Sequence, residues 1–260
     1  MIGWQVLITE IIKLRRTRII WLTWLATSIM PLADAMFVWV VKSPERAANF
    51  GLIGTKAEVA GVTADWSGFF ALLRQTEVGG LVLAAVIAAY VFGREYAEGT
   101  AKNMLTLPVA RHWFVAAKLA VVALWFAVLT VWLAVEGLLI ASLLDLPGYS
   151  RGLVVSALSG LALLALVIWM LTPIVSWIAL LGRGYMAPLG FTIFMLVMAN
   201  VVDVVGWGKW FPWSIVTTMA GVIGAPSEAP GPASITVLAI AFLAGVLATT
   251  LQLRYADNTQ

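Results

Sequence analysis

Six stretches of mostly apolar residues divide the chain. Each approaches or exceeds the roughly 20 residues that an α-helix needs to cross the hydrocarbon of a bilayer. They cover approximately residues 19–41, 72–93, 112–144, 153–181, 185–205 and 233–253. The fourth contains Pro173, which is expected to kink its helix. The pattern therefore predicts an all-α polytopic membrane protein with six transmembrane helices, in which residues 1–260 form a single domain.

The first 18 residues have an amphipathic pattern that ends in positive charge. On a helix, one face would carry Trp4, Leu7, Ile8, Ile11 and Leu14, and the other Gln5, Thr9 and Lys13. A cationic cluster follows and consists of Lys13, Arg15, Arg16 and Arg18. An apolar face beside such a cluster is typical of a helix lying in the headgroup layer. Residues 1–18 are therefore predicted to be an interfacial helix, and a cleaved signal peptide is disfavoured because the apolar run continues to Val41.

Positive charge predicts the orientation of the six spans. Six crossings place both termini on one side of the membrane. With the termini inside, the inner segments contain ten of the 16 lysines and arginines and the outer segments six. The inner ones are Lys13, Arg15, Arg16, Arg18, Arg94, Lys102, Arg111, Lys118, Arg183 and Arg254. An excess of positive charge marks the cytoplasmic side, so we expect a protein of the inner (cytoplasmic) membrane with both termini cytoplasmic.

The last outer loop, residues 206–232, has a pattern of its own. Its first part is aromatic, with Trp207, Trp210, Phe211 and Trp213. An apolar run of about twelve residues follows, which is too short to span a bilayer. This combination indicates a re-entrant or interfacial helix within the loop.

The polar segment 94–111 separates the second and third predicted spans. Gly99 breaks the preceding helix, Thr100 can cap a new one, and Pro108 ends it. The apolar face of this short amphipathic helix consists of Ala101, Met104 and Leu105. With the termini inside, the segment is cytoplasmic.

Charged residues border this segment on both sides. We expect the Glu95 carboxylate to hold the loop through Arg94, Lys102 or a backbone donor, and Arg111 to tie the loop to the next helix. Lys118 is expected to lie where the third predicted span leaves the headgroups and to extend its long side chain back to water.

The residues of this region resemble the cytoplasmic loop of ABC-2 type transporter permeases. The shared pattern is F-x-x-E-x-x-x-G-T, then P-x-x-R, then A-K, at Phe92, Glu95, Gly99, Thr100, Pro108, Arg111, Ala117 and Lys118. In that family the loop contains the coupling helix, which docks on a separate ATP-binding subunit. The resemblance implies an ATPase-coupling role for Glu95, Gly99, Thr100, Met104, Leu105, Pro108 and Arg111. The alternative is an ordinary charged loop.

The resemblance also implies the partners. They are a separate ABC ATPase, which would bind ATP and Mg, and a second permease subunit, so that six helices make half of the pathway. In this chain we find no G-x-x-x-x-G-K-[ST] phosphate loop. The chain is therefore expected to have no cofactor and no enzymatic activity of its own.

Acidic residues within the predicted spans are the other notable feature, because a charge in hydrocarbon needs a cavity or a partner. Asp34, Glu77 and Glu136 are expected to line a cavity for a cationic amphiphile, with Trp132 on its apolar part. Arg74 and Glu77, three residues apart, are expected to pair. The alternative is that each acid has a purely structural partner.

Composition excludes several other classes of protein. The chain is 62% hydrophobic and only 11% charged, far from the balance of soluble domains. It has no cysteine and one histidine, so a metal site is not expected, and its net charge of +3 does not indicate a nucleic-acid partner. A membrane hydrolase is disfavoured because no G-x-S-x-G occurs.

The sequence therefore predicts the permease subunit of an ATP-driven exporter for an amphipathic substrate: a drug, an antimicrobial peptide or a lipid. Two alternatives stay open. One is an ion-coupled secondary transporter that uses the intramembrane acids. The other is an ABC-2 permease that serves sodium export or metalloenzyme maturation.

Overall fold

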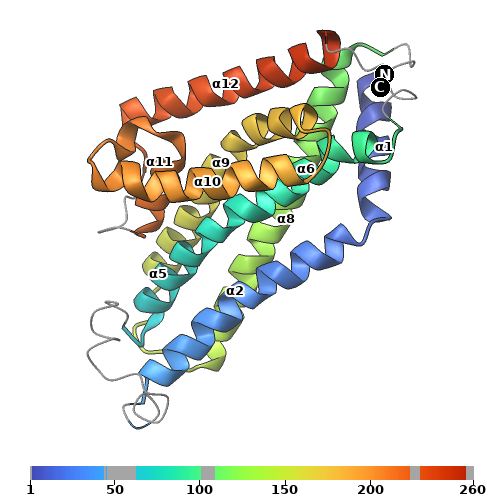
Figure 1. The fold of residues 1–260 in the computed structure, drawn as a ribbon. Coiled ribbons are helices and arrows are strands. Elements are labelled where there is room, and N and C mark those ends of the chain that lie inside the picture. Colours follow the sequence, from blue (N-terminus) through green and yellow to red (C-terminus); the bar gives the residue numbers. More distant parts are fainter. Residues whose placement is uncertain (1, 44, 46–62, 101–108, 223–228, 256–260) are drawn as a thin grey trace.

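A computed structural model of the chain describes residues 2–43, 45, 63–100, 109–222 and 229–255. The regular elements in this part of the chain are helices, arranged as an elongated bundle (Figure 1). They are α1 Ile2–Arg15, α2 Ile19–Val41, α5 Trp66–Thr76, η1 Glu77–Gly79, α6 Gly80–Ala97, α8 Arg111–Leu143, α9 Arg151–Leu181, α10 Met186–Val204, η2 Gly208–Trp210, α11 Pro212–Ala220 and α12 Pro232–Tyr255.

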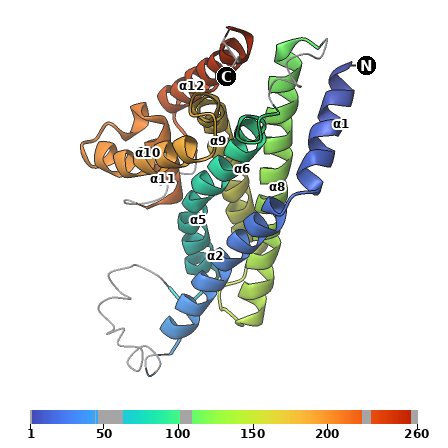
Figure 2. The ribbon, with the colours of Figure 1, turned by 45° about the vertical axis from the view of Figure 1, so that its right-hand side comes forward.

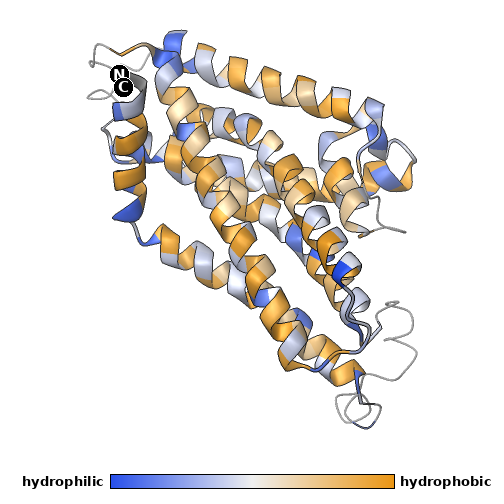
Figure 3. Ribbon diagram, turned by 180° about the vertical axis from the view of Figure 1, so that it is seen from behind, coloured by the Kyte–Doolittle hydropathy of each residue, from blue (hydrophilic) through white to orange (hydrophobic). Residues whose placement is uncertain are grey.

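Six of the described helices are long and apolar enough to cross a membrane. They are α2, the unit α5–η1–α6, α8, α9, α10 and α12. In Figure 3 the ribbons of these helices are mostly coloured as hydrophobic along their length, and hydrophilic residues are more frequent toward the ends. The predicted all-α membrane protein with six spans is thus confirmed.

The second span is longer than the sequence pattern indicated. It begins at Trp66, not near residue 72, because Asp65 caps the helix. The Asp65 Oδ1 accepts hydrogen bonds from the Gly68 amide at 2.7 Å and the Ser67 hydroxyl at 2.6 Å. Capping satisfies amide groups that the first turn leaves without intrahelical partners, so the polar start of the helix is stable.

Close packing around α9 sets the core of the bundle. α12 and α6 both pack on α9. At the crossing with α12, a Cβ on Gly245 would lie only 2.7 Å from the Ile174 amide nitrogen. One turn later on α12, the Thr249 hydroxyl donates to the Pro173 carbonyl at 3.0 Å. Small residues that allow such backbone approach are typical of helix association in membranes.

Helix α1 packs beside α8 and leads directly into α2 (Figure 2). Its buried stripe is Val6, Glu10 and Leu14, whereas Trp4 is 67% exposed. The face turned to the bundle therefore carries a charged residue between two apolar ones. The reason is that Glu10 finds positive partners inside the bundle.

The segment 206–232 contains the short helix α11. Most of its side chains are buried, and the Ser214 hydroxyl donates to the Ala199 carbonyl of α10 at 2.7 Å. Gly221 ends α11 with φ of +74°, a left-handed conformation that glycine adopts without strain. A cavity of about 490 Å³ lies between α11 and the start of α12, lined in part by Asp203, Lys209 and Ser234.

Candidate functional site

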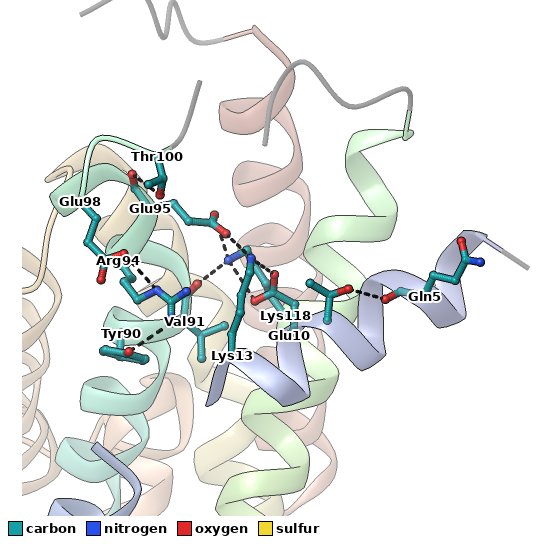
Figure 4. Close-up of polar contacts among 11 residues, drawn as sticks. Gln5, Glu10, Lys13, Tyr90, Val91, Arg94, Glu95, Glu98, Thr100 and Lys118 are labelled. Atoms are coloured by element: carbon teal, nitrogen blue, oxygen red, sulfur yellow. Dashed lines mark hydrogen bonds and ion pairs between the residues drawn. The ribbon is translucent and has the colours of Figure 1, made fainter. Parts of the chain in front are cut away.

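Four charged side chains from three helices meet where α6 ends and α8 begins (Figure 4). We call them the ion-pair ring: Glu10 and Lys13 from α1, Glu95 from α6 and Lys118 from α8. The Lys13 Nζ lies 2.6 Å from Glu10 Oε1 and 2.9 Å from Glu95 Oε1. The Lys118 Nζ lies 3.5 Å from Glu10 Oε2 and 3.1 Å from Glu95 Oε2. Each charge thus contacts both charges of opposite sign.

The ring is largely shielded from solvent. The Lys118 side chain is 2% exposed and those of Glu10 and Glu95 are each 6% exposed, whereas Lys13 remains 32% exposed. Taking a charge out of water costs several kcal/mol, which a buried pair recovers only with good geometry and additional hydrogen bonds. Here the two carboxylates and two ammonium groups balance. Lys118 also donates to the Val91 carbonyl at 2.5 Å.

Local helix geometry explains how the ring assembles. Glu10 and Lys13 are three residues apart on α1 and therefore share one face. Val91 and Glu95 are one turn apart on α6, so the carbonyl and the carboxylate both reach Lys118. Partial burial of the Lys13 ammonium opposes its charged form. The hydrogen bond and charge of Glu10, with those of Glu95, outweigh this effect and raise the pKa of Lys13.

The end of α6 connects the ring to the polar segment. Gly99 has φ of +68°, its amide donates to the Tyr96 carbonyl at 3.2 Å, and the Thr100 amide donates to the Glu95 carbonyl at 2.8 Å. These two bonds form a Schellman motif, which terminates a helix. Glu95 thus closes α6 with its carbonyl and enters the ring with its carboxylate.

The structure changes the surroundings expected for two of these charges, whereas Lys102, one of the partners expected for Glu95, lies outside the described residues. Glu95 pairs with Lys13 and Lys118, whereas Arg94 lies 3.6 Å from Glu98 and donates to the Tyr90 hydroxyl at 3.2 Å. Lys118 does not extend its side chain into solvent, because two carboxylates and a carbonyl hold it inside the bundle.

The other predicted coupling residues are placed only in part. Arg111 is the first residue of α8. Met104, Leu105 and Pro108 lie outside the described residues, as does the short helix predicted between Gly99 and Pro108.

Sequence reasoning missed Glu10 as a member of the site. One signal was available: Glu10 lies four residues from both Val6 and Leu14, so these three positions share a helical stripe. An acid between two apolar residues of a stripe indicates a buried partner.

The intramembrane acids occupy separate surroundings. Asp34 on α2 accepts a hydrogen bond from the Thr76 hydroxyl at 2.9 Å. Glu77 lines a small cavity between α2, α6 and α8, and the described lining residues of that cavity do not include Asp34, Glu136 or Trp132. Glu136 lies half-buried on α8, with its Oε2 atom buried.

Trp132 belongs to the contact between α2 and α8. Its indole nitrogen donates to the Ser28 hydroxyl at 2.8 Å, and its ring lies edge-on to Trp24 at a centroid distance of 5.2 Å. Trp125 repeats the arrangement one layer away, donating to Thr23 at 3.1 Å and contacting Trp24. Such aromatic pairs stabilise packing beyond the area that they bury.

Comparison with known proteins agrees with this architecture. The family model described as ABC-2 family transporter protein matches residues 6–199, about three quarters of the chain. The chain belongs to the ABC-2 family of transporters. The matched region contains all four residues of the ion-pair ring. A relative, the bacitracin transport permease protein BCRB of Bacillus licheniformis, is 31% identical over 179 residues, which cover 68% of this chain and 85% of that protein.

Membership of the ABC-2 family gives the general role of the chain. It is an ABC-2 permease, the membrane subunit of an ABC transporter. Permeases of this kind generally work with a partner ATPase and another permease subunit, and they generally lack ATPase activity of their own.

Proposed function

We propose that this permease dimerises to form an export pathway for an amphipathic substrate, driven by a separate ATPase subunit that binds ATP and Mg. The residues of the coupling role would be Glu95, Gly99, Thr100, Met104, Leu105, Pro108 and Arg111. Both termini and the segment 94–111 would face the cytoplasm. The observation that carries the proposal is the ion-pair ring at the end of α6.

The ring offers a physical route from the coupling segment to the transmembrane helices. A displacement of Thr100 acts on Glu95 through the 2.8 Å backbone hydrogen bond. Glu95 is in turn held by Lys13 of α1 and Lys118 of α8. Because the ring is buried and each charge has two partners, separating these groups is costly, and α1, α6 and α8 are expected to move together at this end.

The coupling role is tested by adding charge to the proposed docking face. The double variant Met104→Asp and Leu105→Asp should insert and fold but bind the co-expressed ATPase weakly, and it should lose substrate-stimulated ATP hydrolysis. Ser150→Asp is the matched control, because Ser150 caps α9 and an aspartate can accept the same bond from Leu153. Normal ATPase binding and turnover in the double variant would contradict the coupling role.

The relative named for bacitracin transport supports bacitracin as the first cargo to test. Cells that express the permease with its ATPase should tolerate more bacitracin than cells that express the Met104→Asp and Leu105→Asp variant. Equal tolerance of bacitracin in both strains would argue for another cargo. Drugs, other antimicrobial peptides and lipids are then compared by the same protection assay.

A further inference from the structure

The second span changes its hydrogen bonding about a third of the way along its length. Glu77–Gly79 form a single 3₁₀ turn between α5 and α6, about 16 Å along the helix from Trp66 at 1.5 Å per residue. Two glycines let neighbouring helices close on this turn. A Cβ on Gly79 would lie 2.8 Å from the Met30 Cε of α2, and one on Gly80 would lie 3.2 Å from the Phe126 Cζ of α8.

The Glu77 side chain is enclosed at this point. Glu77 is 2% exposed, and neither of its carboxyl oxygens forms a hydrogen bond with any described group. It lines a cavity with Thr27 and Met30 of α2 and with Thr130 of α8. An ionised carboxylate in such surroundings is strongly disfavoured and tends to become neutral.

The polar side chains of the other described residues lining this cavity act as acceptors toward it. The Thr27 hydroxyl already donates to the Thr23 carbonyl at 2.8 Å, and the Thr130 hydroxyl donates to the Phe126 carbonyl at 3.1 Å. Each hydroxyl therefore has only lone pairs left to offer. A carboxylate would find no donor in these two hydroxyl groups, whereas a neutral carboxylic acid, which carries one O–H donor, is complementary to their oxygens.

The cavity has room for one small partner. Its volume is about 20 Å³, enough for a single water molecule. Such a water could accept the proton of the Glu77 carboxyl group and donate to the hydroxyl oxygens of Thr27 and Thr130.

The charged groups on the surrounding helices do not form hydrogen bonds with Glu77. The positive charge of Arg74, one turn earlier on α5, favours the ionised form of Glu77, but burial of the carboxyl group opposes that form more strongly, and the Glu77 oxygens make no hydrogen bond to Arg74. Asp34 of α2 is engaged by Thr76, and Glu136 of α8 is absent from the described lining of the cavity. α9 and α11 also pack against η1; α11 has no charged residue, and α9 has only Arg151 at its start.

We propose that Glu77 is a proton-binding site, occupied in the packed arrangement of α2, η1, α6 and α8. The proton comes from water and forms an O–H bond with one carboxyl oxygen, and it returns to water when these helices separate enough to hydrate the group. The proposal concerns the permease alone and is independent of the coupling role and of the cargo.

Infrared spectroscopy of the purified full-length permease in lipid nanodiscs tests this site. At neutral pH the wild-type protein should show the C=O stretch of a protonated carboxylic acid, shifted by D₂O. The band should be lost in Glu77→Gln, which imitates a neutral acid in size and should fold normally. It should persist in Glu98→Gln, because Glu98 is an exposed acid with a 53% exposed side chain.

The result is decisive in either direction. Absence of the band from wild type, or an equal band in Glu77→Gln, would overturn the proposal. If Glu77→Gln does not fold, wild type labelled with ¹³C in the glutamate carboxyl is compared with Glu136→Gln. A band that shifts with the label and is retained in Glu136→Gln supports the assignment of the proton to Glu77. A band that does not shift with the label, or that is lost in Glu136→Gln, overturns the assignment.

Discussion

Replacing Lys118 with methionine removes one of two positive charges from the ion-pair ring. Methionine fills a similar volume, so the main effect is electrostatic. Glu10 and Glu95 would then share Lys13 alone, and one buried negative charge would lack compensation. Breaking a buried pair by removing one partner costs about 3–5 kcal/mol. Lys13 is one-third exposed and still contacts both carboxylates, so we expect the lower end, about 3 kcal/mol.

The assay is thermal unfolding of the purified permease in nanodiscs. For a chain of this size, 1 kcal/mol corresponds to about 2–4 °C, so the midpoint of Lys118→Met should fall by about 6–12 °C. Adding Glu10→Gln restores neutrality and leaves Lys13 and Glu95 paired at 2.9 Å. The double variant should therefore recover most of the loss.

Arg151→Met is the control for removal of a positive charge. Arg151 is exposed at the start of α9, so its loss should change the midpoint little. The reasoning is refuted if Lys118→Met unfolds at the wild-type temperature, or if Glu10→Gln lowers the midpoint of the Lys118→Met variant further.

Three further outcomes are expected. Gly245→Ala should destabilise the bundle because its Cβ meets the backbone of α9, whereas Gly190→Ala, with nothing within 4 Å, should be neutral or slightly stabilising in the same unfolding assay. Asp65→Ala should cost about 1 kcal/mol at neutral pH. Burial opposes ionisation of Asp65, but hydrogen bonds from Ser67, Gly68 and Thr63 outweigh it and lower its pKa. The stabilisation by Asp65 is therefore complete above its pKa in the unfolded chain, near 3.9, and is lost as pH falls through its lower pKa in the folded protein. Wild type and variant should accordingly have the same stability in acid. Tags at both termini should be labelled only after cells are permeabilised, and labelling of either tag in intact cells would reverse the proposed orientation.

Much of the fold was predictable because the membrane imposes a simple rule on the sequence. A span needs about 20 apolar residues, and the chain has six such stretches. The end of α6 could also be predicted, because the left-handed conformation that ends the helix at Gly99 is a local preference of glycine. The earlier start at Trp66 was missed because Asp65 caps a polar turn that hydropathy alone does not assign to a span.

The candidate site depended on contacts that no local pattern contains. Lys118 lies two turns into α8, and a lysine at that position suits the headgroup layer as well as a buried pair. Its surroundings were decided by Glu10, which lies on a different helix and more than 100 residues earlier.

The sequence by itself determined the class of the protein, the number of spans and the family, because hydropathy and a motif of eight positions depend only on the order of the residues. Only the tertiary structure decided which charges are buried together. Burial of Glu10, Glu95 and Lys118 is tolerable only where opposite charges from three helices converge, and Glu77 is enclosed where side chains of α2 and α8 come close to two glycines. The free energy of a charge depends on its neighbours in space, and those neighbours are set by how the helices pack.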